Sequence, residues 1–100
     1  MGRGSEDLGL VLVANYLNLL SQEENLPRFI AFYNGGVKLV CSKSPVIDIL
    51  KNMEAKGVKL IACKTCLSHF AIADKMEVGM AATMMDIIDL QKKADKVINL

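Results

Sequence analysis

Two cysteines separated by two residues are the feature of this sequence with the clearest chemical potential. Cys63 closes an apolar segment, and Cys66 lies in the following turn, at or near the start of a predicted helix. Free backbone N–H groups and the helix dipole stabilise a thiolate there, and Lys64 adds a positive charge. Because a thiolate is a nucleophile as well as a metal ligand, the pair predicts a reactive site. Cys66 lies nearer the helix start, so we expect it to be the more acidic thiol.

A metal site is the second chemistry that these residues suggest. Cys63, Cys66 and His69 form the pattern C-x2-C-x2-H. A structural zinc site normally has four ligands from two chain segments, and the sequence holds no second pair. Cys41 or a neighbouring subunit would have to supply the fourth, so we expect no metal and no other cofactor. The simpler readings are a surface or interface histidine and two small, inert strand-end cysteines.

Two glycine loops are expected at the same edge of the fold as the cysteines. Asn34-Gly35-Gly36 follows a predicted strand, and Gly2-Arg3-Gly4 precedes the first predicted helix. Glycine loops at helix starts can bind anions, and Arg3 offers a charged partner. The alternative is that these glycines only form turns and that Arg3 is solvated.

The elements that must position these residues alternate between helix and strand. Ser5 is a predicted N-cap, Ser44-Pro45 is a typical helix start, and Gly57 is a typical helix end. Alternating helices and strands indicate a single α/β domain over residues 1–100, with a mostly parallel sheet and helices on both faces. The segment 37–41 is expected to be a helical turn or an irregular connection. The predicted helices cover 5–23, 45–56, 66–75 and 84–93, and the predicted strands cover 28–33, 58–63, 78–80 and 96–100.

Composition excludes several classes of function. The 100 residues include 12 Lys or Arg and 11 Asp or Glu, a balance without the positive charge that nucleic acids or anionic membranes attract. No apolar run reaches the roughly 18–20 residues that span a bilayer. The sequence shows no secretory signal, and its 3 cysteines are an odd number, so we expect reduced thiols in the cytoplasm. Hydrophobic residues make up 52%, which favours burial against a second copy of the chain.

Four segments together resemble the DsrE-like domain found at the C-terminus of YedF-type proteins. The resemblance implies a three-layer α/β/α sandwich, an oligomer, and a persulfide carried on Cys63 or Cys66. It also implies that Gly2, Arg3, Gly4, Asn34, Gly35 and Thr65 line the site, since they match the motif positions of the family. The segments are GRGSEDLG, FYNGGVKLV, SPVIDILKNMEAKGVKLIACKTCL and ADKVINL.

The sequence departs from the YedF pattern in two ways. It contains no N-terminal TusA-like domain, so we expect a sulfur donor or a TusA-like acceptor to act as a separate partner protein. The first strand of the family, which precedes its G-R-G loop, has no counterpart here, because the loop begins at Gly2. Either the start is truncated or the sheet is completed otherwise, for example by a partner chain.

Three functions remain open from the sequence. The leading hypothesis is a sulfur carrier that accepts a persulfide at the Cys63–Cys66 turn and passes it to an acceptor thiol. The second is a thiol–disulfide redox protein that uses the same pair. The third is a non-catalytic, oligomeric binding subunit in which the cysteines are structural.

Overall fold

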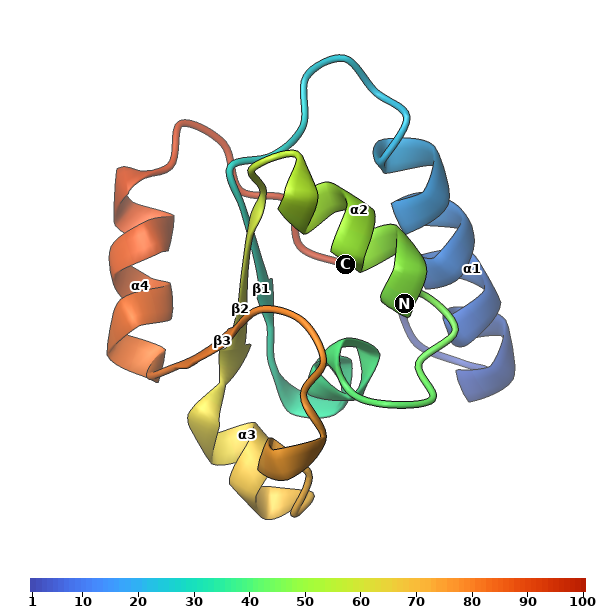
Figure 1. Cartoon of the computed structure of the whole chain (residues 1–100), viewed down its shortest axis with the longest axis vertical. Coiled ribbons are helices and arrows are strands. Elements are labelled where there is room, and N and C mark those ends of the chain that lie inside the picture. The colour runs from blue at the N-terminus through green and yellow to red at the C-terminus, as the bar shows by residue number, and fades with distance from the viewer.

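The fold is the α/β arrangement that the sequence predicts, with helices on both faces of a parallel sheet. The computed structural model describes residues 1–100. In Figure 1, α1 and α2 lie on one side of the sheet, where they pack together, and α4 lies on the other. None of the helices is both long and apolar enough to cross a membrane. The elements are α1 (Glu6–Leu20), β1 (Phe29–Phe32), the 3-10 helix η1 (Asn34–Val40), α2 (Ile47–Ala55), β2 (Lys59–Cys63), α3 (Lys64–His69), the 3-10 helix η2 (Ala73–Lys75), β3 (Met80–Ala82) and α4 (Met84–Lys93).

The sheet has three parallel strands in the order β1-β2-β3. The central strand β2 is buried from Leu60 to Cys63, as expected for a parallel strand that is covered on both faces. Its neighbours are in register with it, Phe32 opposite Ala62 and Ala82 opposite Cys63. All three strands therefore end at one edge of the sheet, where η1, α3 and α4 begin (Figure 1).

The core forms on and around β2. Leu50 and Met53 of α2 and Ile87 of α4 cover the sheet from opposite sides. Gly79 permits the approach of β3, because a Cβ atom there would lie 2.7 Å from the backbone oxygen of Leu60. The fully buried side chains of largest volume are Leu50, Met53, Leu60, Leu67, Val37, Val40, Val46 and Cys63.

Several predicted boundaries are confirmed or shift by a few residues. Ser5 caps α1, since its hydroxyl accepts the N–H of Leu8 at 3.1 Å. Ser44 instead supports a turn, in which its hydroxyl accepts the N–H of Val46 at 3.2 Å, so α2 begins only at Ile47. The connection after β1 is the 3-10 helix η1. The predicted edge strand 78–80 lies at 80–82, because Gly79 adopts a φ of 76° and turns the chain just before pairing begins.

The predicted strand over 96–100 is wrong. No strand forms there, and Val97, Ile98 and Leu100 are exposed. One side-chain hydrogen bond ties the segment to the sheet, from the hydroxyl of Tyr33 to Oδ1 of Asn99 at 3.0 Å. β-branched residues favour a strand only where a neighbouring strand offers a ladder of backbone hydrogen bonds, and this segment has none.

The predicted helix 66–75 is instead split at Ala71. Ala71 has a φ of 55°, and the N–H groups of Ala71 and Ile72 bond to the carbonyls of Ser68 and Leu67. This is the Schellman pattern, which ends α3 and normally uses glycine at the left-handed position. Alanine is therefore strained here, and the chain resumes helical geometry only in η2.

Replacing Ala71 by glycine should stabilise the protein. The left-handed conformation costs a residue with a Cβ about 1–2 kcal/mol, which exceeds the entropy that glycine adds to the unfolded chain. We expect Ala71→Gly to raise the free energy of unfolding by about 0.5–1 kcal/mol, measured by urea denaturation. The matched control Ala55→Gly, within α2, should lower it by up to about 1 kcal/mol. Equal losses in both variants would contradict the strained position of Ala71.

Candidate functional site

The candidate site lies where β2 passes directly into α3. Cys63 is both the last residue of the strand and the N-cap of the helix, with no loop between the two elements. Cys66 is the third residue of α3. Cys63 is only 1% exposed, whereas Cys66 is half-buried, and both are free thiols. The predicted placement of the pair, at a strand end and a helix start, is confirmed.

Cys63 and Cys66 are neighbours because of their positions at the helix start. Side chains at the N-cap and at the third helical residue approach each other, as in a capping box. Each thiol affects the pKa of the other: Cys66 lowers the pKa of Cys63, and Cys63 raises the pKa of Cys66. The side chain of Cys63 makes no capping hydrogen bond to α3. The N–H groups of Cys66 and Thr65 nevertheless stabilise negative charge on its sulfur and so lower its pKa.

The loop after β1 supplies the other contact to the pair. The backbone N–H of Asn34 donates to Sγ of Cys66 at 3.0 Å. Asn34 has a φ of 52°, the left-handed conformation that asparagine tolerates better than most residues. Gly35 and Gly36 follow it, and the space where their side chains would stand is open. Asn34 therefore contacts the thiol, and Gly35 leaves the surface beside Asn34 uncrowded.

The hydrogen bonds at the pair make Cys63 the more acidic thiol. The hydrogen bond from Cys66 is the largest influence lowering the pKa of Cys63, and the N–H groups of Cys66 and Thr65 add to it, against the effect of burial. The pKa of Cys66 is raised, first because its proton is held by Cys63 and then by burial, while the Asn34 N–H opposes both. The expected order, with Cys66 the more acidic, is therefore reversed. Cys63 stands at the cap position itself, which the sequence-based argument did not consider.

The remaining predicted site residues fall into two groups, one at this site and one at the N-terminus of the chain. Thr65 lies against Cys63, as its hydroxyl and N–H both lower the pKa of that thiol. The loop Gly2-Arg3-Gly4 makes no hydrogen bond to the cysteines or to Asn34. It folds back toward α1, where the amino group of Met1 donates to the carbonyl of Gly9 at 3.1 Å.

His69 does not join the cysteines in a metal site. No three His, Cys, Asp or Glu side chains gather in a group that could hold a metal ion. His69 packs edge-on against the ring of Phe70, with the ring centres 5.1 Å apart.

The seam between η1 and α3, where Asn34 contacts Cys66, also contains two residues that the sequence did not single out. Nζ of Lys38 lies 4.5 Å from the centre of the Phe70 ring. Lys38 follows Asn34 by four residues, and Phe70 follows Cys66 by four. This equal spacing of four residues could have indicated that the Lys38–Phe70 contact lies beside the Asn34–Cys66 contact. A cation thus lies along the seam that holds the Cys66 sulfur.

A cavity lies beside α3, and neither cysteine lines it. It has a volume of about 510 Å³, and Lys64, Thr65 and Ser68 of α3 line it together with residues of η2 and β3. Cys66 instead faces η1, through Asn34. The sulfur of Cys66 therefore lies in the seam and not in this cavity.

The coupling between the two thiols predicts opposite shifts when either one is removed. In Cys63→Ser, Cys66 no longer gives its proton to a thiolate, so its pKa should fall and its alkylation by iodoacetamide should begin at lower pH than in the wild type. In Cys66→Ala, Cys63 loses its main donor and its pKa should rise. Thiolate ultraviolet absorbance against pH measures both changes, and the alkylation rate follows the accessible Cys66 alone. If Cys66 titrates alike with and without Cys63, the two thiols are not coupled.

Comparison with known proteins agrees with this architecture. The family model described as DsrE/DsrF-like matches residues 2–100, which is nearly the whole chain. No curated protein sequence matches the chain. The narrower resemblance to YedF-type proteins stays a prediction. Because the match extends over the entire α/β domain and its cysteine pair, the chain belongs to the DsrE/DsrF-like family.

Proposed function

We propose that this protein is a sulfur carrier that holds a persulfide on Cys66 and passes it to an acceptor thiol. Membership of the DsrE/DsrF-like family supports a general role in sulfur handling. The observation that carries the specific proposal is the environment of Cys66: its half-buried sulfur accepts the Asn34 N–H at 3.0 Å and lies against a second, buried thiol. Both contacts suit a sulfur atom that alternates between thiol, thiolate and persulfide.

Loading begins with proton transfer within the pair. The Cys63 thiolate takes the proton of Cys66, its neighbour in the first turn of α3. The Cys66 thiolate then attacks the outer sulfur of a donor persulfide, R–S–SH, and the sulfur–sulfur bond of the donor breaks. Cys66 becomes Cys66–S–SH and the donor leaves as a thiolate. Solvent protonates that thiolate, because the buried sulfur of Cys63 cannot reach it.

Unloading is the same exchange in the reverse direction. A thiolate of the acceptor attacks the outer sulfur of the persulfide, and Cys66 leaves as a thiolate. The Asn34 N–H stabilises this leaving group. The resemblance implies a sulfur-donor protein and a TusA-like acceptor as partners, and the chemistry requires reduced thiols, as in the cytoplasm.

We also propose that the protein is a homo-oligomer that buries the outer face of α1. From Leu8 to Gln22 the chain has no charged residue, and Leu19 is 64% exposed. A helix with so little polar surface normally has another element against each of its faces. A second copy fits this uncharged face because it brings an identical apolar surface. The exposed apolar residues of α1 are Leu8, Leu10, Val11, Leu12 and Leu19.

Intact mass spectrometry tests the carrier function. Protein purified without oxygen is treated with glutathione persulfide, and we expect the wild type to gain one sulfur atom. Cys66→Ser should lose this gain. Cys41→Ser is the matched control and should keep it, because Cys41 is buried away from the pair, with Sγ donating to the Val37 carbonyl at 3.4 Å.

The other two functions give different masses in the same experiment. Loss of two hydrogens without added sulfur would favour a thiol–disulfide redox protein. No change in any variant would favour a non-catalytic binding subunit. Either result would contradict the carrier function.

Sedimentation velocity tests the proposed oligomer. The wild type should sediment as a dimer or a larger species, and Val11→Lys should shift it toward the monomer, because a charge cannot be buried in an apolar interface without a partner. Gln91→Lys places the same charge on exposed α4 and should leave the distribution unchanged. A monomeric wild type would contradict the interface, even if the carrier function holds.

A further inference from the structure

Cys63 is a nucleophile with a single accessible target. Its side chain is 1% exposed, so neither a donor nor an acceptor can reach its sulfur without opening the fold. The thiol beside it is that of Cys66, in the first turn of the helix that Cys63 caps. The carrier function proposed above uses Cys63 only to hold a proton. The geometry allows it a second reaction.

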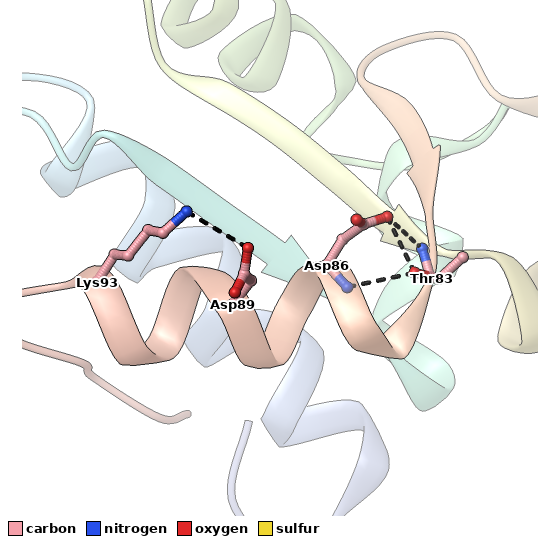
Figure 2. Close-up of polar contacts among 4 residues, drawn as sticks. All are labelled: Thr83, Asp86, Asp89 and Lys93. Carbon is pink, nitrogen blue, oxygen red and sulfur yellow. Dashed lines mark hydrogen bonds and ion pairs between the residues drawn. The ribbon is translucent and has the colours of Figure 1, made fainter.

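The start of α4 shows how closely such a pair can approach. Thr83 and Asp86 occupy the same N-cap and third-residue positions relative to α4, at the end of the adjacent strand β3. Their side chains meet at 3.0 Å, from Oγ1 of Thr83 to Oδ2 of Asp86 (Figure 2). Cys63 and Cys66 occupy the same two positions at the start of α3, which places their side chains next to each other on one helical turn.

We propose that Cys63 discharges the persulfide of Cys66 and releases hydrosulfide when no acceptor takes the sulfur. This activity rests on the proposed carrier function. The Cys63 thiolate attacks Sγ of Cys66, a bond forms between the two cysteine sulfurs, and the bond between Sγ and the outer sulfur breaks. The outer sulfur leaves as HS⁻. The two cysteines are oxidised to a disulfide, and the sulfane sulfur is reduced to sulfide by the same two electrons.

Position decides which sulfur is attacked. Sγ of Cys66 is the inner sulfur of the persulfide, and it is fixed to the first turn of α3, whose N-cap is Cys63. Attack on the outer sulfur would place the sulfane sulfur on Cys63, where 1% exposure would prevent any acceptor from collecting it. Once Cys66 carries sulfur, its Sγ no longer bears a proton, yet the N–H groups of Cys66 and Thr65 remain to stabilise the Cys63 thiolate.

The consequence is a choice between two products. With an acceptor thiol present, the outer sulfur is transferred and both cysteines stay reduced. Without one, the protein releases hydrosulfide and is left with a Cys63–Cys66 disulfide, which blocks reloading. A dithiol reductant must then restore the pair, so repeated turnover converts persulfide sulfur to sulfide with electrons from that reductant.

A single-turnover experiment tests the discharge. The full chain is loaded to completion with glutathione persulfide, and the excess is removed by rapid desalting at low pH, where thiolates are protonated. Return to neutral pH without any reductant starts the reaction, and hydrosulfide is trapped and quantified while intact mass is followed. We expect the wild type to release one hydrosulfide per chain and to end two hydrogens lighter than the unloaded protein.

Three variants separate this inference from the carrier function. Cys63→Ser should still load, because the pKa of Cys66 falls once the Cys63 sulfur is absent. It should then keep its sulfur, because serine is a good N-cap but a poor nucleophile toward sulfur. Cys66→Ser should not load. Cys41→Ser should behave as the wild type does, and loss of discharge in this variant would overturn the role of Cys63.

The failures of the two proposals can be told apart. If the wild type loads but holds its sulfur as long as Cys63→Ser does, the discharge is wrong and the carrier function stands. If the sulfur resides on Cys63, the discharge is also wrong. If neither the wild type nor Cys63→Ser loads, the carrier function fails, and the discharge fails with it.

Discussion

The direct junction between β2 and α3 is the constraint on which the rest of the site depends. Most strand-to-helix connections contain a loop of a few residues, but here Cys63 ends the strand and Lys64 begins the helix. Burial of β2 fixes Cys63 in the core, and the first turn of α3 then places Cys66 against it. The two residues therefore stay neighbours as long as the sheet and the helix start are intact. Their mutual influence on pKa is thus a result of the fold.

This arrangement gives two chemically equal side chains different roles. Cys63 is surrounded by the core and by groups that lower its pKa, while external reagents are excluded from it. Cys66 has the raised pKa but reaches the seam between α3 and η1, where the Asn34 N–H donates to its sulfur. The more acidic thiol is therefore buried, and the less acidic one is accessible. Accessibility and acidity are divided between two atoms in contact, which allows proton transfer to control the reactivity of the exposed one.

Much of this could be predicted from local sequence patterns. The apolar segment before Cys63 indicates a buried strand, and a cysteine pair at its end indicates a helix-start site, as observed. The order of acidity could not be predicted in this way, because it depends on which cysteine occupies the cap, and a shift of the helix start by two residues changes the answer. The strand expected over 96–100 fails for a different reason. Strand propensity is a property of the segment alone, whereas a strand forms only beside another strand. The local sequence does not show whether such a neighbouring strand is within reach.

The position of the sulfane sulfur tests the central claim most directly. Lys64 lies between the two cysteines, so trypsin places Cys63 and Cys66 on separate peptides, and Cys41 falls on a third, between Lys38 and Lys43. Protein treated with glutathione persulfide, blocked by alkylation and digested would reveal which peptide carries the extra sulfur. The account predicts that it is the peptide that begins at Thr65 and contains Cys66. Extra sulfur on the Cys63 or Cys41 peptide, or on none of the three, would contradict it.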